Sequence, residues 1–353
     1  MNVALADLRD HLAQPALALD DAGRPSDVLT VVDLDVGVPD EPTIAAVQQA
    51  TTRVLIGVAS TPPPSRSREL VQALDLTVVG GPAGRLDPAL VHADDPAAEC
   101  AALTAAVTRN PRASLALTGL LHLTEQLPVS AGLFAESAVY SMLLAGPEFG
   151  SWRAGQPRRP LPEYGRSPVA LRRSGDELEV VLDYPQRRNA FSWQMRDGLA
   201  EAFDLVLADP SIAQVRVRGA GPVFCSGGDL DEFGTSADVS VAHLVRLDRS
   251  VAARIDRCRD RVSVFVHGAG IGAGIELPAF AGLVTAHPDT VFQLPELGMG
   301  LVPGAGGTVS ITRRVGRWRT AYLALRGTPI DAATALTWGL VDQLTDDAPD
   351  GSG

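Results

Sequence analysis

The sequence predicts an α/β protein, and three observations lead to that prediction. Beyond residue 168, short apolar segments typical of buried strands alternate with amphipathic segments typical of helices. Three consecutive helix-like segments precede them, over residues 96–152. Finally, 46% of the 353 residues are hydrophobic and 20% are charged, so the chain can bury a sizeable core.

The elements of the first half are predicted in order along the chain. Residues 1–95 read as a degenerate α/β segment without a cluster of acids, nucleophiles or metal ligands. Three apolar runs in it are typical of buried strands: 28–34, 53–59 and 76–79. Three helices follow, separated by Asn-Pro and Leu-Pro pairs: 96–110, 111–127 and 132–146. Residues 153–168 are rich in Pro, Gly and Arg, and they predict a linker.

Strands and helices alternate after the linker. Apolar runs predict five strands: 178–183, 215–219, 262–267, 283–285 and 291–293. Helical periodicity predicts six helices: 192–207, 239–259, 276–280, 307–315, 317–326 and 332–338. Ser192 is a candidate N-cap for the first of these helices.

Composition excludes several function classes. The net charge is −12 and both halves are acidic, which argues against a nucleic-acid partner. Three scattered cysteines argue against a disulfide framework or a cysteine-based zinc site. The apolar runs stay under about ten residues, whereas a membrane span needs ~20. With no signal peptide at the N-terminus, we expect a cytoplasmic protein without a membrane partner.

Two glycine-rich turns each follow a predicted strand, at 225–229 (CSGGD) and 268–274 (GAGIGAG). Glycine lets the backbone approach a ligand closely, and two N–H groups aimed at one point form an oxyanion hole. For either turn alone, a purely structural tight turn is the more common explanation. Neither turn completes a nucleotide-binding fingerprint, because the acidic residue about 20 positions further on is missing and the chain has no lysine.

Two glutamates lie beside these turns. Glu276 follows the second turn among apolar neighbours, and Glu296 lies in the loop QLPELGMG. A carboxyl group in apolar surroundings has a raised pKa and is a candidate acid or base. Each glutamate alone is more readily structural, but together they indicate a paired acid/base site.

Five segments in order carry a resemblance to a known family: 187–192 (RRNAFS), 221–233 (GPVFCSGGDLDEF), 266–280 (VHGAGIGAGIELPAF), 292–308 (FQLPELGMGLVPGAGGT) and 335–344 (ALTWGLVDQL). From about residue 176 to 344 the chain resembles the crotonase superfamily, also called the enoyl-CoA hydratase/isomerase family. The resemblance implies a spiral of β-β-α units that assembles as a homotrimer or a dimer of trimers. Its members bind acyl-CoA thioesters, so CoA enters as part of the substrate, and neither a further cofactor nor a metal is expected.

The resemblance also assigns roles by position. It implies that the thioester oxygen lies between the N–H groups of Gly228 and Ala273, and that Glu276 and Glu296 are the catalytic pair. Hydration of a 2-enoyl-CoA, or the reverse dehydration, is the expected reaction, with Glu276 on the water and Glu296 on the Cα proton. Isomerase, hydrolase and decarboxylase chemistry stay open on this fold, as does a non-catalytic acyl-CoA-binding subunit.

Further residues are expected to bind the substrate. By the resemblance, Arg187, Arg188 and Ala190 lie where the family's loop contacts the adenine and phosphates of CoA. A solvated basic turn is the alternative for the two arginines. In the oxyanion loop, three residues are also expected to contact substrate: Ser226, Asp229 and Leu230.

One departure from the family pattern concerns the end of the sequence. Family members continue past a GLV segment such as 339–341 in helices that cover the acyl-CoA site, whereas this sequence ends in an acidic stretch. The upstream helices resemble that cover and include a GL-x-x-E helix. We therefore expect residues 96–152 to cover the site of a crotonase-like catalytic domain at 169–353. Residues 1–95 would be the eroded N-terminal portion of a first crotonase unit.

Overall fold

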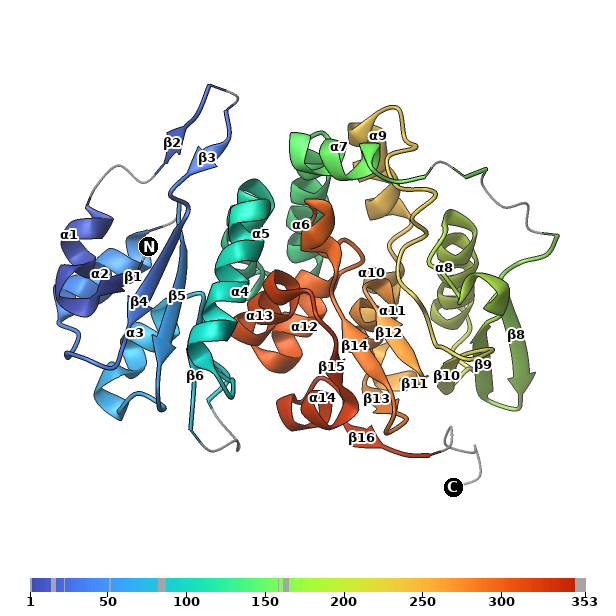
Figure 1. The fold of residues 1–353 in the computed structure, drawn as a ribbon. Helices are drawn as coiled ribbons and strands as arrows, with labels where there is room; N and C mark the ends of the chain where they lie inside the picture. Colours follow the sequence, from blue (N-terminus) through green and yellow to red (C-terminus); the bar gives the residue numbers. More distant parts are fainter. Residues whose placement is uncertain are drawn as a thin grey trace.

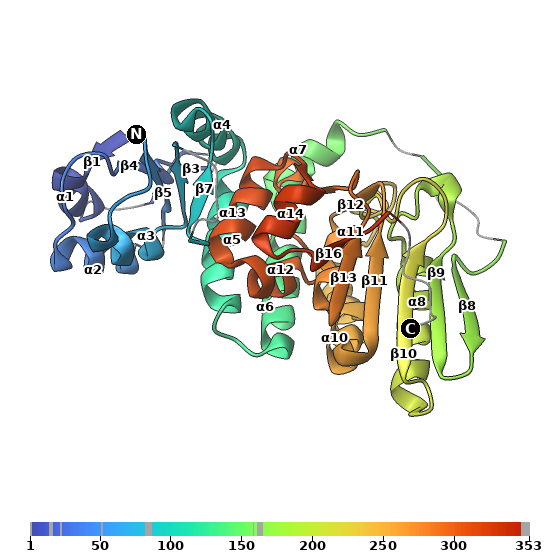
Figure 2. The ribbon, with the colours of Figure 1, turned by 90° about the horizontal axis from the view of Figure 1, so that it is seen from below.

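The computed structural model describes residues 2–13, 17–21, 23–50, 52–81, 87–157, 159–160 and 165–346. Within them the chain forms two main sheets of mostly parallel strands, one from each half of the sequence (Figure 1). Helices from both halves lie between the two sheets (Figures 1 and 2). The α/β fold class predicted from the sequence is confirmed.

The N-terminal sheet has five strands in the order β1-β4-β5-β6-β7, and all neighbouring strands are parallel. Its strands are β1 (Asn2–Ala4), β4 (Leu29–Asp33), β5 (Val54–Ala59), β6 (Leu76–Val79) and β7 (Leu90–His92). Three helices and a small hairpin accompany it: α1 (Leu8–Leu12), α2 (Glu41–Gln49), α3 (Arg68–Ala73), β2 (Ala18–Leu19) and β3 (Pro25–Ser26). Residues 1–95 therefore hold more regular structure than their sequence predicts. Strands β4, β5 and β6 match the three predicted strands, whereas β1, β7 and helices α1 to α3 were not predicted.

Four helices connect the two sheets: α4 (Pro96–Arg109), α5 (Pro111–Thr124), α6 (Val129–Leu144) and α7 (Pro147–Ala154). The side chain of Asp95 caps α4 by accepting a hydrogen bond from the Ala98 N–H at 3.0 Å. Helix α7 takes the first two residues of the predicted linker 153–168. Residues 158 and 161–164 of that linker lie outside the described residues.

The C-terminal sheet has six strands in the order β16-β13-β11-β10-β9-β8. All pairs are parallel except the β8–β9 hairpin. Its strands are β8 (Val169–Ser174), β9 (Glu177–Leu182), β10 (Gln214–Gly219), β11 (Val262–Val266), β13 (Leu283–Ala286) and β16 (Gln343–Leu344). A smaller sheet contains β12 (Ala269–Ile271), β14 (Val291–Gln293) and β15 (Ile330–Asp331).

Seven helices belong to the C-terminal half: α8 (Trp193–Ala208), α9 (Val239–Asp248), α10 (Val251–Arg257), α11 (Ala273–Glu276), α12 (Gly307–Val315), α13 (Arg317–Arg326) and α14 (Ala332–Trp338). Ser192 caps α8 as predicted, accepting from the Met195 N–H. The single helix predicted over 239–259 is two helices, because Ser250 starts a new one by capping α10. Helix α11 ends at Glu276, and Pro278 opens a 3-10 turn directly after it.

The upstream helices pack against the C-terminal half. Helix α5 contacts α12 and α13, and α6 contacts α9 and α12. Helix α13 in turn contacts β6 and β7 of the N-terminal sheet. One hydrophobic core includes buried side chains of both halves, from Val28 to Val341. The two halves therefore share a core.

The two sheets repeat one strand order. Strands β1-β4-β5-β6-β7 and strands β9-β10-β11-β13-β16 run in the same sequence, and every neighbouring pair in both sets is parallel. Two copies of one ancestral unit would give this repetition. The assignment of residues 1–95 to an eroded crotonase unit stays a prediction.

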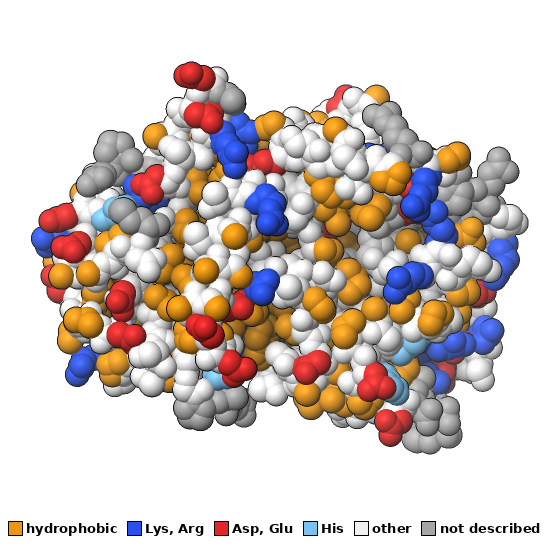
Figure 3. Space-filling view, in the orientation of Figure 1, with side chains coloured by type: hydrophobic (Ala, Val, Ile, Leu, Met, Phe, Trp, Pro, Cys, Tyr) orange, Lys and Arg blue, Asp and Glu red, His pale blue; other side chains and the backbone are white. Residues whose placement is uncertain are grey.

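Over the described residues, no single helix has both the length and the apolar character that crossing a membrane requires. Helices α6 and α7 meet the criterion only as a pair, and they are bent by 60° relative to each other. On the face shown in Figure 3, acidic and basic side chains are interspersed.

Candidate active site

The turn between β12 and α11 forms the centre of the candidate site. Gly272 has φ +49, and a Cβ at this position would lie 2.5 Å from Oε1 of Glu296 and 3.8 Å from Oε1 of Glu276. A side chain at this position would displace the carboxyl group of Glu296, and the positive φ favours glycine. The two predicted catalytic glutamates therefore face the same point of the backbone.

The two predicted glycine turns lie side by side. Cys225 N–H donates to the Ala269 carbonyl and Ile271 N–H donates to the Cys225 carbonyl, both at 3.1 Å. In the part of the chain that the structure describes, the N–H groups of Gly228 and Ala273 form no hydrogen bond. Both predicted oxyanion donors are therefore available to a ligand.

Glu276 is held by the backbone at the N-terminal end of α12 and just before it. Its Oε2 accepts hydrogen bonds from the N–H groups of Ala305 and Gly307, each at 2.8 Å. The side chain is buried, and burial raises the pKa of Glu276 to about 7 although the two N–H groups oppose the shift.

Glu296 starts a 3-10 turn, Glu296–Met299, and is also buried. Among the described residues its Oε2 has no hydrogen-bond partner. Burial raises the pKa of Glu296 well above its usual range, and the neighbouring charge of Glu276 raises it further. A buried carboxyl oxygen without a donor favours the protonated form.

A third buried glutamate, Glu136 of α6, reaches the same loop from the upstream half. Its Oε1 accepts from the Gly306 N–H at 2.7 Å, and its Oε2 accepts from the N–H and the hydroxyl of Thr308 at 3.0 and 2.6 Å. Burial first, and then the charge of Glu276, raise the pKa of Glu136 to about 8. The sequence interpretation named the GL-x-x-E helix, whose last motif residue is Glu136, but gave Glu136 no role in the site. An acid within the apolar helix segment GLFAESAVY was the signal that could have identified it.

Comparison with known proteins identifies the family. Residues 176–348 match the family model described as enoyl-CoA hydratase/isomerase. The chain is 33% identical over 181 residues to the "Probable enoyl-CoA hydratase EchA14" of Mycobacterium tuberculosis, covering 51% of this chain and 70% of that protein. The chain belongs to the enoyl-CoA hydratase/isomerase family.

Other members of the enoyl-CoA hydratase/isomerase family show similar identity. The "Probable enoyl-CoA hydratase 2, mitochondrial" of Arabidopsis thaliana is 36% identical over 166 residues, which cover 47% of this chain and 55% of that protein. The "1,2-epoxyphenylacetyl-CoA isomerase" of Escherichia coli is 32% identical over 175 residues, which cover 48% of this chain and 66% of that protein. The chain thus spans little more than half of the Arabidopsis relative, and the family match leaves residues 1–175 uncovered.

The predicted CoA-contact loop is fixed by internal ion pairs. Nη2 of Arg187 donates to both carboxylate oxygens of Asp229, at 2.7 and 2.8 Å, and to Asp231 at 2.7 Å. These contacts hold the loop against the oxyanion turn and use the carboxylate of Asp229. Arg188 is exposed, with φ +53. Contacts of Arg187 and Arg188 with CoA stay predictions.

The other predicted contact residues surround the same turn. Ala190 is buried, and Leu230 is 46% exposed. Ser226 N–H donates to the Arg188 carbonyl at 3.0 Å, which joins the oxyanion turn to the CoA-contact loop. Substrate contacts of Ser226, Asp229 and Leu230 stay predictions.

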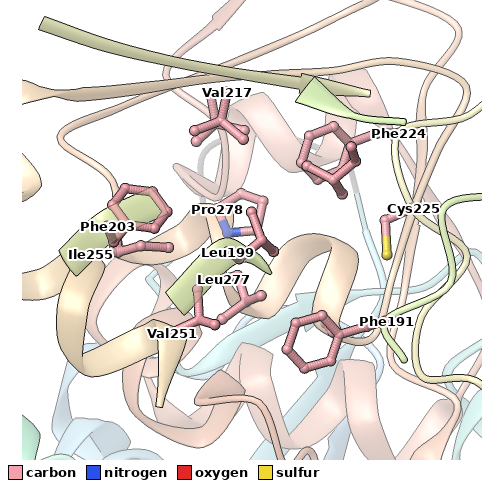
Figure 4. Close-up of a pocket in the computed structure, with 13 residues that line it drawn as sticks. Phe191, Leu199, Phe203, Val217, Phe224, Cys225, Val251, Ile255, Leu277 and Pro278 are labelled. Atoms are coloured by element: carbon pink, nitrogen blue, oxygen red, sulfur yellow. The ribbon is translucent and has the colours of Figure 1, made fainter. Parts of the chain in front are cut away.

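Beneath the oxyanion turn lies a small apolar cavity of about 20 Å³ (Figure 4). Phe191, Cys225 and Leu277 line it together with Ala273. Burial raises the pKa of the Cys225 thiol to about 12, so this cysteine is a packing residue rather than a nucleophile. Within the described residues, no group of three or more His, Cys, Asp or Glu side chains could hold a metal ion.

Proposed function

We propose that the chain catalyses hydration of a 2-enoyl-CoA thioester, or the reverse dehydration. The observation that carries the proposal is the position of Glu276 and Glu296, whose carboxyl oxygens both approach Gly272, next to the unbonded N–H of Ala273. The named hydratases among the relatives support it.

The N–H groups of Gly228 and Ala273 would donate hydrogen bonds to the thioester oxygen of the substrate. As water adds to Cβ, negative charge develops on that oxygen, and hydrogen bonds to it strengthen. Each well-placed donor contributes about 3–4 kcal/mol to such a transition state in acyl-transfer sites. The donors come from the backbone, so the methyl group of Ala273 does not remove one.

The two glutamates divide the proton transfers. Glu276 accepts hydrogen bonds from two backbone N–H groups, which stabilise its ionised form. It would therefore act as the base that takes a proton from the attacking water. The hydroxide part of that water bonds to Cβ, and the double-bond electrons move toward the thioester oxygen. The enolate then collapses, and Cα takes the proton of Glu296. Proton exchange between the two carboxyl groups or with solvent restores the starting state.

The same site could move a double bond without adding water. Isomerisation is the second candidate function, because one relative, from Escherichia coli, is named as an isomerase. In that reaction one carboxyl group would move a proton from one carbon of the substrate to another. Hydrolysis of the thioester and non-catalytic binding of acyl-CoA are the remaining alternatives.

For the assembled protein we propose a homotrimer or a dimer of trimers in the cytoplasm. Five apolar side chains on α6 and α9 support an interface there, because they are exposed: Phe134, Met142, Val241, Leu244 and Val245. Light scattering coupled to size exclusion measures the mass, and a monomer would contradict this part of the proposal.

The activity is tested with crotonyl-CoA. Loss of the enoyl absorbance with formation of 3-hydroxybutyryl-CoA supports hydration. Loss of absorbance with formation of 3-butenoyl-CoA would instead identify an isomerase, and release of free CoA a hydrolase. Binding of crotonyl-CoA without formation of any product would indicate a non-catalytic acyl-CoA-binding subunit.

A further inference from the structure

A second, larger cavity lies beside the candidate active site. It has a volume of about 200 Å³, far more than the about 10–15 Å³ that one water molecule needs. Its walls come from α6, from the end of α9, from the start of α10 and from the segment Gly304–Gly306. The Ala305 N–H in that segment donates a hydrogen bond to Glu276. A residue that lines the cavity therefore contacts the proposed catalytic carboxylate directly.

Arg246 of α9 lines this cavity, and its hydrogen bonds within the described residues all go to neutral groups. Its Nε donates to the Ser137 hydroxyl at 3.1 Å, and its Nη2 donates to the Ser137 carbonyl at 3.2 Å and to the Ser141 hydroxyl. Its guanidinium carbon lies 4.9 Å from the centre of the Tyr140 ring. That ring packs on Gly304, where a Cβ would lie only 2.4 Å from it. The guanidinium is therefore held in place on the cavity wall.

The other charged side chains of the cavity are already compensated. Arg196 pairs with Asp197 at 2.8 Å, and Arg249 pairs with Asp248 at 3.3 Å. Both oxygens of Glu136 accept hydrogen bonds from the loop before α12.

Among the described residues Arg246 forms no ion pair, and the carboxyl group of Glu136, which lines the same cavity, acts on it only at longer range. Burial lowers the pKa of Arg246. A cation that is partly removed from water without an anion costs free energy, which a bound anion would recover.

We infer that the acyl group of the substrate carries a carboxylate at the end remote from the thioester, and that Arg246 binds it. The inference rests on the proposed function, because it takes the thioester to lie at Gly228 and Ala273. Arg246 contacts Tyr140, Tyr140 packs on Gly304, and the next residue, Ala305, donates to Glu276. These contacts connect the group that would bind the carboxylate to the site that would bind the thioester. A guanidinium matches the planar geometry of a carboxylate and forms strong, charge-assisted hydrogen bonds with it. A neutral acyl chain would offer the guanidinium of Arg246 no anionic partner.

Affinity for two unreactive thioesters of equal acyl length tests the inference. Glutaryl-CoA ends in a carboxylate and pentanoyl-CoA ends in a methyl group, and titration calorimetry measures both against the full-length protein. We expect glutaryl-CoA to bind at least ~10-fold more tightly, because hydrogen bonds between charged groups are stronger than those between neutral groups. Equal affinity, or tighter binding of pentanoyl-CoA, would overturn the inference while crotonyl-CoA hydration still supported the proposed function. Absence of binding by either thioester, together with no turnover of crotonyl-CoA, would overturn the proposed function and the inference together.

Variants then assign the preference to Arg246. Arg246→Met should abolish the preference for glutaryl-CoA, Arg246→Lys should retain part of it, and Arg257→Met should leave it unchanged because Arg257 is exposed on α10 and does not line the cavity. Equal weakening of both thioesters and of free CoA by Arg246→Met would indicate that Arg246 binds the CoA phosphates, and this would contradict the inference. If Arg246→Met does not fold, the comparison of the two thioesters on the unmodified protein still decides whether a carboxylate is preferred.

Discussion

Gly272 is the residue on which the geometry of the site depends most. Because its φ is +49 and a Cβ would lie 2.5 Å from Oε1 of Glu296, a methyl group here would strain the backbone and displace that carboxyl group. We expect Gly272→Ala to lower turnover of crotonyl-CoA by ~10², because displacement of a catalytic group by about 1 Å has an effect of that size. Gly298→Ala is the matched control, since it lies in the same loop as Glu296 and its Cβ would meet nothing within 4 Å. Steady-state kinetics of both variants measure the effect, and equal rates for both would contradict it.

The ionisation of the two glutamates predicts the pH dependence of the reaction. Burial raises the pKa of Glu276 to about 7, and the base must be ionised, so kcat/KM should rise as the pH passes through about 7. The pKa of Glu296 is raised well above its usual range, and the acid must be protonated, so kcat/KM should fall again at higher pH. The pH values of this rise and this fall are properties of the coupled pair of carboxyl groups rather than of single residues. A rate that stays constant from pH 5 to pH 9 would show that the pair does not control the reaction.

At the scale of the elements, the two glycine turns are predicted to supply the oxyanion donors. Gly228→Pro removes one N–H, so turnover should fall by ~10²–10³, the loss seen when one oxyanion donor is removed. Gly228→Ala keeps the N–H, and its Cβ would lie 2.6 Å from the ring of Phe233, so that ring must shift while the donor stays. It should therefore retain far more activity. Circular dichroism must show both variants folded, and a folded Gly228→Pro protein with normal turnover would remove Gly228 from the oxyanion hole.

Elements that carry local signals could be predicted from the sequence, and elements without them could not. The Ser192 cap, the turns around Gly272 and the helices α12 to α14 all carry capping residues, glycines or clear periodicity. Strand β8 was missed because it is an exposed edge strand with polar side chains such as Arg172 and Arg173. Glu276 and Glu296 could be found because each follows a recognisable local motif. Arg246 could not, and Glu136 was missed although it is an acid in an apolar helix segment, because the partners of both lie 105 to 172 positions away.

At the scale of the whole molecule, the upstream half completes the site of the downstream half. Glu136 of α6 accepts hydrogen bonds from Gly306 and Thr308, in the loop that also holds Glu276. Ser141 of the same helix accepts from Arg246. The buried faces of α12 and α13 pack against α5.

A truncated chain of residues 167–353 should therefore aggregate or fail to bind acyl-CoA. Removal of residues 1–166 would expose apolar side chains that α4 to α6 cover. It would also leave the backbone N–H of Gly306 without the carboxylate of Glu136. Residues 1–157 supplied as a separate chain should restore binding. Light scattering and titration with butyryl-CoA measure both states. A soluble, fully active 167–353 chain would show that the upstream half is an independent module.

The central claim is that Glu276 and Glu296 act together on an acyl-CoA held by the backbone. The most direct measurement compares turnover and binding in Glu276→Gln and Glu296→Gln, using crotonyl-CoA for the rate and butyryl-CoA for the affinity. Each substitution should lower kcat by ~10² or more, because general acid/base catalysis typically supplies 10²–10⁴, while the affinity for butyryl-CoA stays nearly unchanged. A variant of either glutamate that retains the unmodified rate would contradict the paired mechanism.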